Sequence, residues 1–197
     1  MKNPKEEQTF MLIKPDGVQK GLIGEIIKRL EQRDLKVVAL EMFHASKKEI
    51  DTHYPHDEKW IRRLGEKTLS TYQKAGLDIK DVKKDFNTTD LLKVGKVVRG
   101  WLVDFMSSSP MVKMVVEGVH AVEMVRKIGG PTMPYLAEMG TIRGDYSADS
   151  ALSANMERRA VYNLVHASET PEEAKHEINH WFGKKTIFKY KRFGVDR

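Results

Sequence analysis

The 197-residue sequence contains no cysteine, so it has neither a disulfide framework nor a thiolate metal site. No apolar run approaches the roughly 20 residues that are needed to cross a bilayer. The first eight residues, MKNPKEEQ, lack the apolar centre of a secretory signal. These absences together favour a cytoplasmic protein in a reducing compartment, with no membrane partner.

Two common phosphate-binding patterns are also missing, the P-loop and the glycine-rich dinucleotide fingerprint. His53 and His56 lie too close together in a loop to be more than a weak metal signal, and we expect no protein metal site. A phosphate site here would have to be built from lysine, arginine, threonine and histidine. The net charge of +6 favours an anionic partner, but it does not choose among nucleotide, nucleic acid and lipid.

The chain is long enough for one domain with a substantial core. Four mostly apolar stretches predict strands, and amphipathic or capped stretches between and after them predict helices. The segment from about 56 to 96 is more polar, with enough apolar residues to pack as two short helices. The resulting order predicts an α/β sandwich in which one sheet is covered by helices. The predicted strands are residues 9–15, 35–45, 110–118 and 161–167.

Residues 163–178, NLVHASETPEEAKHEI, place a histidine just before a well-marked helix. Thr170 and Glu173 predict a capping box at the start of that helix. Glu177 borders the buried stripe of the helix, where a carboxylate needs a hydrogen-bonding partner, and His166 is the candidate. A carboxylate on one ring nitrogen fixes the tautomer and leaves the other nitrogen available as a nucleophile. The alternative, a core histidine beside a surface glutamate, is the commoner arrangement when this stretch is taken alone.

Several cationic and polar residues add candidates for a phosphate site. Lys14 ends an apolar strand and is held by the Pro-Asp-Gly that follows, although a snorkelling lysine is the alternative. Arg143 lies between two glycines in GTIRGD, which suits bidentate phosphate contact, and a surface turn with a salt bridge is its alternative. Arg126 closes a helix, and its alternative is an ordinary charge near a helix C-terminus. Thr132 follows a glycine pair, and its alternative is a loop residue with no role in binding.

Taken together, these stretches resemble the nucleoside diphosphate kinase family. The resemblance covers most of the chain except two insertions, at about 57–96 and about 147–158. It implies a single domain over 1–197, with a helical first insertion and a ferredoxin-like fold: an α/β sandwich whose four-stranded antiparallel sheet is covered by helices. The segments that carry it are TFMLIKPDGVQKGLIGEIIKRLEQ, VVEG, AVEMVRKIGG, GTIRGD, and N-x-x-H-x-S with a glutamate eleven residues after the histidine.

The resemblance also implies a role for each candidate residue. His166 is similar to the phosphate-accepting histidine of the family, Glu177 to the carboxylate that orients it, and Ser168 to the serine that supports that glutamate. Lys14 and Asn163 resemble the pair that reaches the sugar hydroxyl and the phosphates. The residues that resemble a phosphate clamp are Arg126, Thr132 and Arg143.

Three positions concern the nucleotide base and the edge of the site. Tyr54 matches the family tyrosine near the histidine. Val98 stands where the family usually has a phenylalanine on which the base stacks, so it is a candidate nucleotide contact, and the stacking surface is either weaker or supplied elsewhere. Met139 replaces a proline that usually precedes GTIRGD.

The implied activity is transfer of the γ-phosphate of a nucleoside triphosphate, mainly ATP, to a nucleoside diphosphate. The implied route is a ping-pong mechanism through a phosphohistidine at His166. Mg²⁺ is the expected cofactor, bridging phosphate oxygens rather than sitting in a protein cage. The resemblance further implies a homo-oligomer, a tetramer or a hexamer.

Two other functional classes fit parts of the sequence. A catalytically silent nucleotide-binding regulatory module on the same fold would be expected to have lost the histidine, the lysine or the arginines, and none is missing. An RNA-binding ferredoxin-like domain would need stacking aromatic residues on its central strands. Residues 110–118 contain none and residues 9–15 contain only Phe10, so a nucleic-acid partner is not expected.

Overall fold

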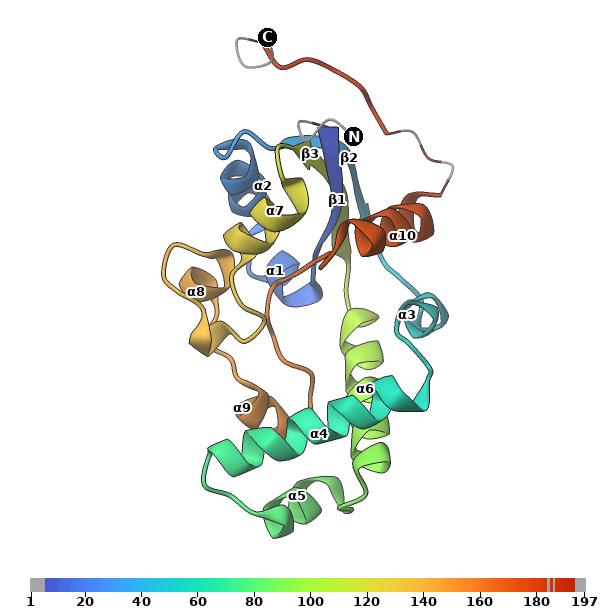
Figure 1. Ribbon diagram of the computed structural model, residues 1–197, viewed down its shortest axis with the longest axis vertical. Coiled ribbons are helices and arrows are strands. Elements are labelled where there is room, and N and C mark those ends of the chain that lie inside the picture. The colour runs from blue at the N-terminus through green and yellow to red at the C-terminus, as the bar shows by residue number, and fades with distance from the viewer. Residues whose placement is uncertain (1–5, 184, 186, 194–197) are drawn as a thin grey trace. The chain divides into compact units, whose positions relative to one another are not determined.

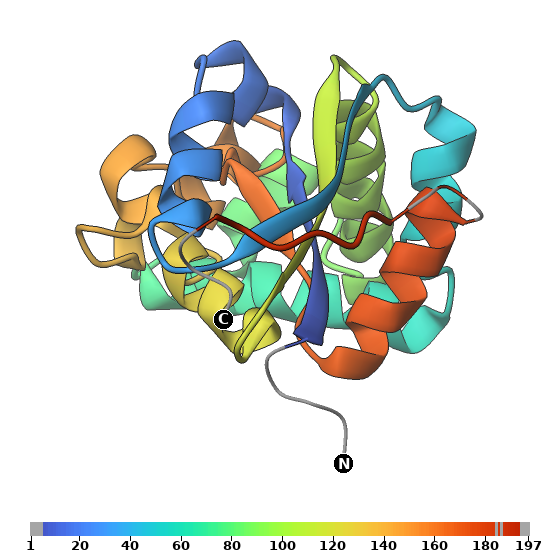
Figure 2. The same ribbon diagram turned by 90° about the horizontal axis from the view of Figure 1, so that it is seen from above.

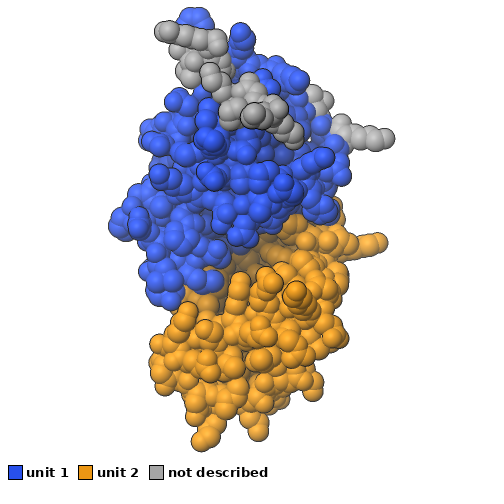
Figure 3. Space-filling model, in the orientation of Figure 1, with its two compact units in different colours: residues 1–43, 110–148, 163–197 blue, residues 44–109, 149–162 orange. Residues whose placement is uncertain are grey.

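The computed structural model describes residues 6–183, 185 and 187–193, and the chain divides into two compact units. Unit 1 comprises residues 1–43, 110–148 and 163–197, and unit 2 comprises residues 44–109 and 149–162 (Figure 3). The whole of the insertion expected at 57–96 therefore lies in unit 2, together with neighbouring residues on both sides. The prediction of one domain over the whole chain stays a prediction.

Unit 1 is built on a four-stranded antiparallel sheet with the strand order β2-β3-β1-β4 (Figure 1). The strands are β1 (Glu7–Ile13), β2 (Lys36–Phe43), β3 (Met111–Gly118) and β4 (Val165–Ala167). This sheet and its covering helices confirm the predicted ferredoxin-like fold. The central strand β1 pairs with both β3 and β4, and β4 carries His166.

Helices cover both faces of this sheet (Figure 2). On one face, Met11 and Ile13 of β1 pack in a core with residues of α2 (Ile23–Glu31) and α7 (Ala121–Gly129). On the other face, Phe10 stacks against Trp181 of α10 (Pro171–Phe182), with ring centroids 6.2 Å apart. The alternation of side chains along a strand explains why neighbouring residues of β1 serve opposite faces.

Unit 2 is helical, as expected for the insertion. It contains α3 (Lys47–His53), α4 (Glu58–Lys74), α5 (Ile79–Phe86), α6 (Leu91–Met106) and α9 (Ala151–Met156). The helix α4 runs for 17 residues rather than forming one of two short helices, and α6 begins inside the segment that was expected to hold only those two. The core of this unit consists of Tyr72, Val82, Phe86 and Val94.

The helices α4 and α6 approach each other so closely that only glycine fits at two positions. A Cβ atom on Gly65 would lie 2.0 Å from the carbonyl oxygen of Leu91, and one on Gly95 would lie 1.9 Å from that of Ile61. Both obstacles are backbone atoms, which cannot move without separating the helices. The two glycines therefore set the spacing of this helix pair.

Three local predictions were wrong in detail. The Pro-Asp-Gly segment, expected as a turn, begins the short helix α1 (Pro15–Gln19), and GTIRGD, expected as a loop, leads into α8 (Ile142–Tyr146). The strand predicted over 161–167 is reduced to the three residues of β4. The cause lies at Leu164, whose φ of +68° interrupts the extended conformation just before that strand.

The glycine contacts in unit 2 predict opposite effects for two alanine substitutions on α6. Gly95→Ala forces the two helices apart and should lower the free energy of unfolding by about 1–3 kcal/mol or more. Gly100→Ala is the matched control, because a Cβ there meets no atom within 4 Å. It should raise the stability by about 0.5–1 kcal/mol through helix propensity. Urea denaturation of both variants measures the difference, and equal stabilities would contradict the close approach.

Candidate active site

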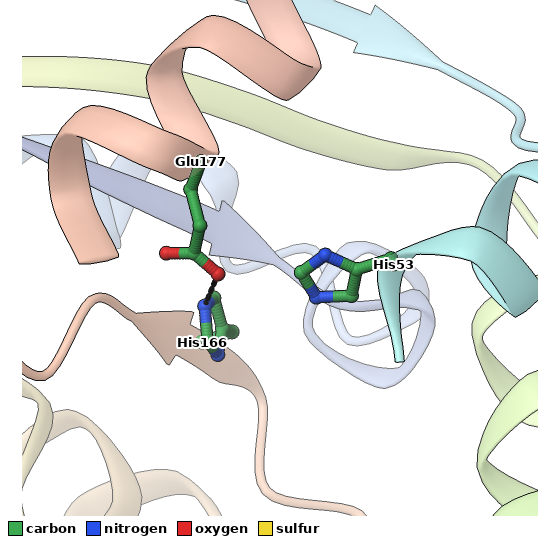
Figure 4. A group of neighbouring side chains, drawn as sticks. All are labelled: His53, His166 and Glu177. Atoms are coloured by element: carbon green, nitrogen blue, oxygen red, sulfur yellow. Dashed lines mark hydrogen bonds and ion pairs between the residues drawn. The ribbon is translucent and has the colours of Figure 1, made fainter. Parts of the chain in front are cut away.

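The histidine and the glutamate that the sequence suggested as partners are in contact. His166 Nε2 lies 2.6 Å from Glu177 Oε1 (Figure 4), and the Ser168 hydroxyl donates to Glu177 Oε2 at 2.6 Å. The Glu177 side chain is only 4% exposed, so both of its oxygens are held in a buried position. A carboxylate only accepts hydrogen bonds, which assigns the proton to Nε2 and leaves Nδ1 as the basic nitrogen of the ring.

The helix α10 delivers Glu177 to this position. Its first turn is capped by Thr170, whose hydroxyl accepts the N–H of Glu173 at 3.2 Å, with proline at the first helical position. The other half of the expected capping box is absent, because the Glu173 carboxylate accepts the N–H of Glu169 instead of that of Thr170. Glu177 points inward because it shares the buried face of α10 with Ala174, Trp181 and Phe182.

His166 lines a cleft of about 1220 Å³ within unit 1. Three other residues that the sequence proposed for phosphate contact line the same cleft: Arg126, Thr132 and Arg143. Further walls come from α2, from α7 and from the loop at 138–141. The structure therefore brings the proposed nucleophile and the proposed phosphate clamp into one cavity.

Lys14 and Asn163 form a buried pair that connects to the same region. The Lys14 ammonium donates to Asn163 Oδ1 at 2.7 Å, and Asn163 Nδ2 donates to the carbonyl oxygen of Thr132 at 3.0 Å. Burial and the nearby charge of Arg143 lower the pKa of Lys14 to about 8, although the charge of Asp16 opposes this. The amine is therefore close to losing its proton under ordinary conditions, and an incoming anion would hold the proton on it.

Arg143 is a buried guanidinium whose bonds organise the chain before β4. It donates to the carbonyl oxygens of Asn163 at 3.0 Å, Gly130 at 2.6 Å and Val165 at 2.6 Å. Burial lowers the pKa of Arg143 to about 10. Because a guanidinium has five N–H donors, two remain for a phosphate after these three bonds. Arg143 thus supports the backbone at His166 as well as lining the cleft.

Arg126 is in a different environment from Arg143. Its side chain is 48% exposed, and it donates to the carbonyl oxygen of Glu169 at 3.0 Å and reaches the Glu169 carboxylate at 3.4 Å. An exposed ion pair of this kind contributes little to stability. Arg126 can therefore exchange Glu169 for a phosphate at small cost.

Two predicted site residues belong to unit 2. The carbonyl oxygen of Tyr54 accepts a hydrogen bond from Arg99 at 3.2 Å, and its ring lies 6.0 Å from that of Trp60. Val98 packs against the core of unit 2. Their parts in nucleotide binding stay predictions. Met139 lines the cleft in unit 1 and is 82% exposed.

Sequence reasoning missed two residues of this region. Asp16 is 5% exposed and accepts the N–H of Leu164 at 2.9 Å, although its pattern indicated only a turn. Glu169 holds Arg126, but nothing in the sequence distinguishes it from the other glutamates near α10. The signal that could have found Asp16 is a carboxylate directly between proline and glycine at the end of a buried strand.

The site combines a histidine that is fixed by a buried carboxylate with a cleft lined by two arginines and a threonine. This combination is typical of sites that transfer phosphate groups through a nitrogen nucleophile. The comparisons with known proteins agree. The sequence profile of the family described as nucleoside diphosphate kinase matches residues 7–62 and 59–187. The chain belongs to the nucleoside diphosphate kinase family, whose members are phosphotransferases.

Individual relatives are similar along nearly their whole length. A nucleoside diphosphate kinase of Pyrobaculum aerophilum is 48% identical over 181 residues, which is 92% of this chain and 97% of that protein. The crystal structure of an NDP kinase from Pyrobaculum aerophilum matches with a TM-score of 0.86 and 46% identity, over 93% of this chain and 100% of that one. A structure of the enzyme from Borrelia burgdorferi, a transition-state mimic with vanadate and ADP, matches with a TM-score of 0.74 and 34% identity. This match covers 97% of this chain and 95% of that one.

The lowered pKa of Lys14 predicts a specific pH dependence of stability. Below pH 8 the amine is charged in both the folded and the unfolded chain, and its burial cost is fully present. Between about 8 and 10.5 only the unfolded chain keeps the proton, so stability rises with pH. The free energy of unfolding of the wild type, relative to Lys14→Met, should therefore rise by roughly 2–3 kcal/mol between pH 7 and pH 10. Chemical denaturation at both pH values measures this, and a constant difference would contradict the assignment.

Proposed function

We propose that this protein transfers the terminal phosphate of a nucleoside triphosphate, mainly ATP, to a nucleoside diphosphate through a phosphohistidine at His166. The observation that carries the proposal is the contact of His166 Nε2 with the buried Glu177 carboxylate at the wall of the cleft. That contact directs Nδ1 of the ring to the chemistry. The vanadate and ADP in the Borrelia burgdorferi structure support a nucleotide phosphate as the ligand of this type of site.

In the first half-reaction, the lone pair of His166 Nδ1 attacks the terminal phosphorus in line. An N–P bond forms while the P–O bond to the diphosphate breaks, and the leaving oxygen keeps the bonding electrons. The ring gains positive charge, which the Glu177 carboxylate stabilises through Nε2–H. In the second half-reaction, a terminal oxygen of another nucleoside diphosphate forms an O–P bond to the same phosphorus while the N–P bond breaks. The bonding electrons return to Nδ1, which regenerates the neutral ring.

The remaining side chains bind and neutralise phosphate rather than exchange protons. Arg126 releases Glu169 and turns to the nucleotide. The two N–H groups of Arg143 that are not bonded to the backbone donate to phosphate oxygens as well. Thr132 contributes a hydroxyl donor, and Lys14 with Asn163 reaches the phosphates and the sugar hydroxyl. Phosphoryl transfer depends mainly on such positioning and charge neutralisation, so this set suits the reaction.

Mg²⁺ is the cofactor that this site fits. Of the six carboxylates that line the cleft, three are paired with arginines: Glu169 with Arg126, and Glu25 and Asp145 with Arg29. The carboxylate of a fourth, Glu173, accepts a backbone N–H. The donor set therefore suits an ion that is held by phosphate oxygens and water, which is the usual coordination of Mg²⁺ at nucleotides. When bound, the ion neutralises charge on the transferring phosphate.

A homo-oligomer, a tetramer or a hexamer, acting in the cytoplasm completes the proposal. The edge strand β2 exposes Leu40 and Met42, which suits burial against another copy. No helix in the described part of the chain combines the length and apolarity needed to span a membrane. Phe10 is fully buried and so offers no base a stacking surface, which supports the expectation that nucleic acid is not a partner.

The direct test is transfer of label from γ-³²P-ATP in the presence of Mg²⁺. The protein should acquire acid-labile label and lose it on addition of a second nucleoside diphosphate, while His166→Gln should take none. A silent binding module would bind ATP without labelling. An unlabelled wild type, or a labelled His166→Gln variant, would contradict the proposed function.

The hydrogen bonds behind His166 predict a graded series of rates. Glu177→Gln removes the charge that opposes the developing imidazolium and should lower the rate of labelling by about 100-fold. Ser168→Ala removes one donor to that carboxylate and should cost about tenfold. Glu172→Gln, the same change at an exposed position of α10, is the control and should be neutral. Single-turnover labelling measures all three, and equal rates for Glu177→Gln and Glu172→Gln would refute the role of Glu177.

A further inference from the structure

Leu164 lies two residues before His166, and its backbone has a conformation that residues other than glycine rarely adopt. Its φ is +68° although it is fully buried, and the N–H of Val165 donates to the carbonyl oxygen of Asn163 at 2.7 Å. A hydrogen bond across three residues with positive φ at the centre is the rare, strained form of the γ-turn. Such strain persists only when surrounding interactions hold it, and it is concentrated at functional sites.

Both backbone polar groups of Leu164 are held by the segment that follows β1. The Asp16 carboxylate accepts the N–H of Leu164 at 2.9 Å, and the N–H of Lys14 donates to the Leu164 carbonyl oxygen at 2.8 Å. Arg143 donates to the carbonyl oxygens on either side of the turn, those of Asn163 and Val165. The turn is therefore clamped at every residue, and Asp16 is the only carboxylate in the clamp.

Asp16 is a carboxylate that is almost completely removed from water, which is costly for a charged group. It is 5% exposed, and within the described structure its Oδ1 atom has no hydrogen-bond partner. Burial raises the pKa of Asp16 above its usual value. An asparagine would accept the same hydrogen bond without a buried charge. What the turn requires at position 16 is therefore a buried acceptor for the N–H of Leu164, and not the charge itself.

We propose that Asp16 is a positioning residue of the phosphotransfer reaction. By holding Leu164 in its strained turn, Asp16 sets the direction in which β4 presents the ring of His166. It also sets the position of Asn163, whose side chain bonds Lys14. This inference rests on the proposed function, because it assigns Asp16 to the same site.

Two variants test the proposal: Asp16→Ala removes the acceptor for the N–H of Leu164, and Asp16→Asn retains one. The alanine variant lets the turn relax and should lower the single-turnover rate of His166 labelling by about 100-fold, the effect of misplacing a reacting group by about 1 Å. The asparagine variant keeps an acceptor for the N–H of Leu164 and should stay within about threefold of the wild type. Affinity for ADP, measured by equilibrium dialysis, should fall by less than the labelling rate in the alanine variant, because Arg126 is bonded to Glu169 and not to the turn. It should stay within about threefold of the wild type in the asparagine variant.

A purely structural role makes a different prediction. Val116→Ala destabilises the same core at the far end of β3, and it is the control for lost stability. If Asp16→Ala and Val116→Ala lower the labelling rate equally at matched thermal stability, the proposal is overturned. It is also overturned if Asp16→Ala labels at the wild-type rate, or if Asp16→Asn is as slow as Asp16→Ala.

A second pair of variants probes the same turn without touching Asp16. A Cβ on Gly17 would lie 2.8 Å from the carbonyl oxygen of Leu164, so Gly17→Ala should push on the turn and slow labelling by about tenfold or more. Gly24→Ala is the control, because its Cβ meets nothing within 4 Å. A Gly17→Ala variant that labels at the rate of Gly24→Ala would count against the proposal. Labelling of the wild type is measured first, since its absence would contradict the proposed function rather than this inference.

Discussion

The hydrogen bond between the Glu177 carboxylate and Nε2 of His166 is the interaction on which the site depends. It joins the helix α10 to the strand β4, and it decides which ring nitrogen is basic. Ser168 holds the second carboxylate oxygen, so the glutamate has no freedom to turn away. Since Glu177 is buried, its charge acts on the ring at short range and with little screening by water.

The surrounding parts of unit 1 fix the positions of His166 and Glu177 relative to the cleft. The strand β4 is only three residues long, too short to fix the direction of His166 by sheet pairing alone. The strained turn at Leu164 and the buried Arg143 supply the missing constraint, because together they bond to the backbone of residues 163–165. Burial, together with the charge of this same Arg143, lowers the pKa of Lys14 to about 8.

Much of this architecture follows from the sequence, and the exceptions have physical reasons. Thr170, expected as the cap, identified the start of α10, and the buried stripe of the helix placed Glu177 correctly. The length of β4 and the turn before it were not predictable, because a leucine with positive φ contradicts local propensity and is imposed by contacts distant in sequence. Asp16 was hidden for the same reason: its partner Leu164 lies 148 residues away along the chain.

The position of the phosphate on the ring tests the central claim most directly. Protein with ¹⁵N-labelled histidine, phosphorylated by ATP and examined by ³¹P and ¹⁵N NMR, distinguishes the two possible phosphohistidines by the nitrogen that couples to phosphorus. Because Glu177 occupies Nε2, the phosphate should be found on Nδ1 of His166. A phosphate on Nε2, or on any other histidine, would contradict the account.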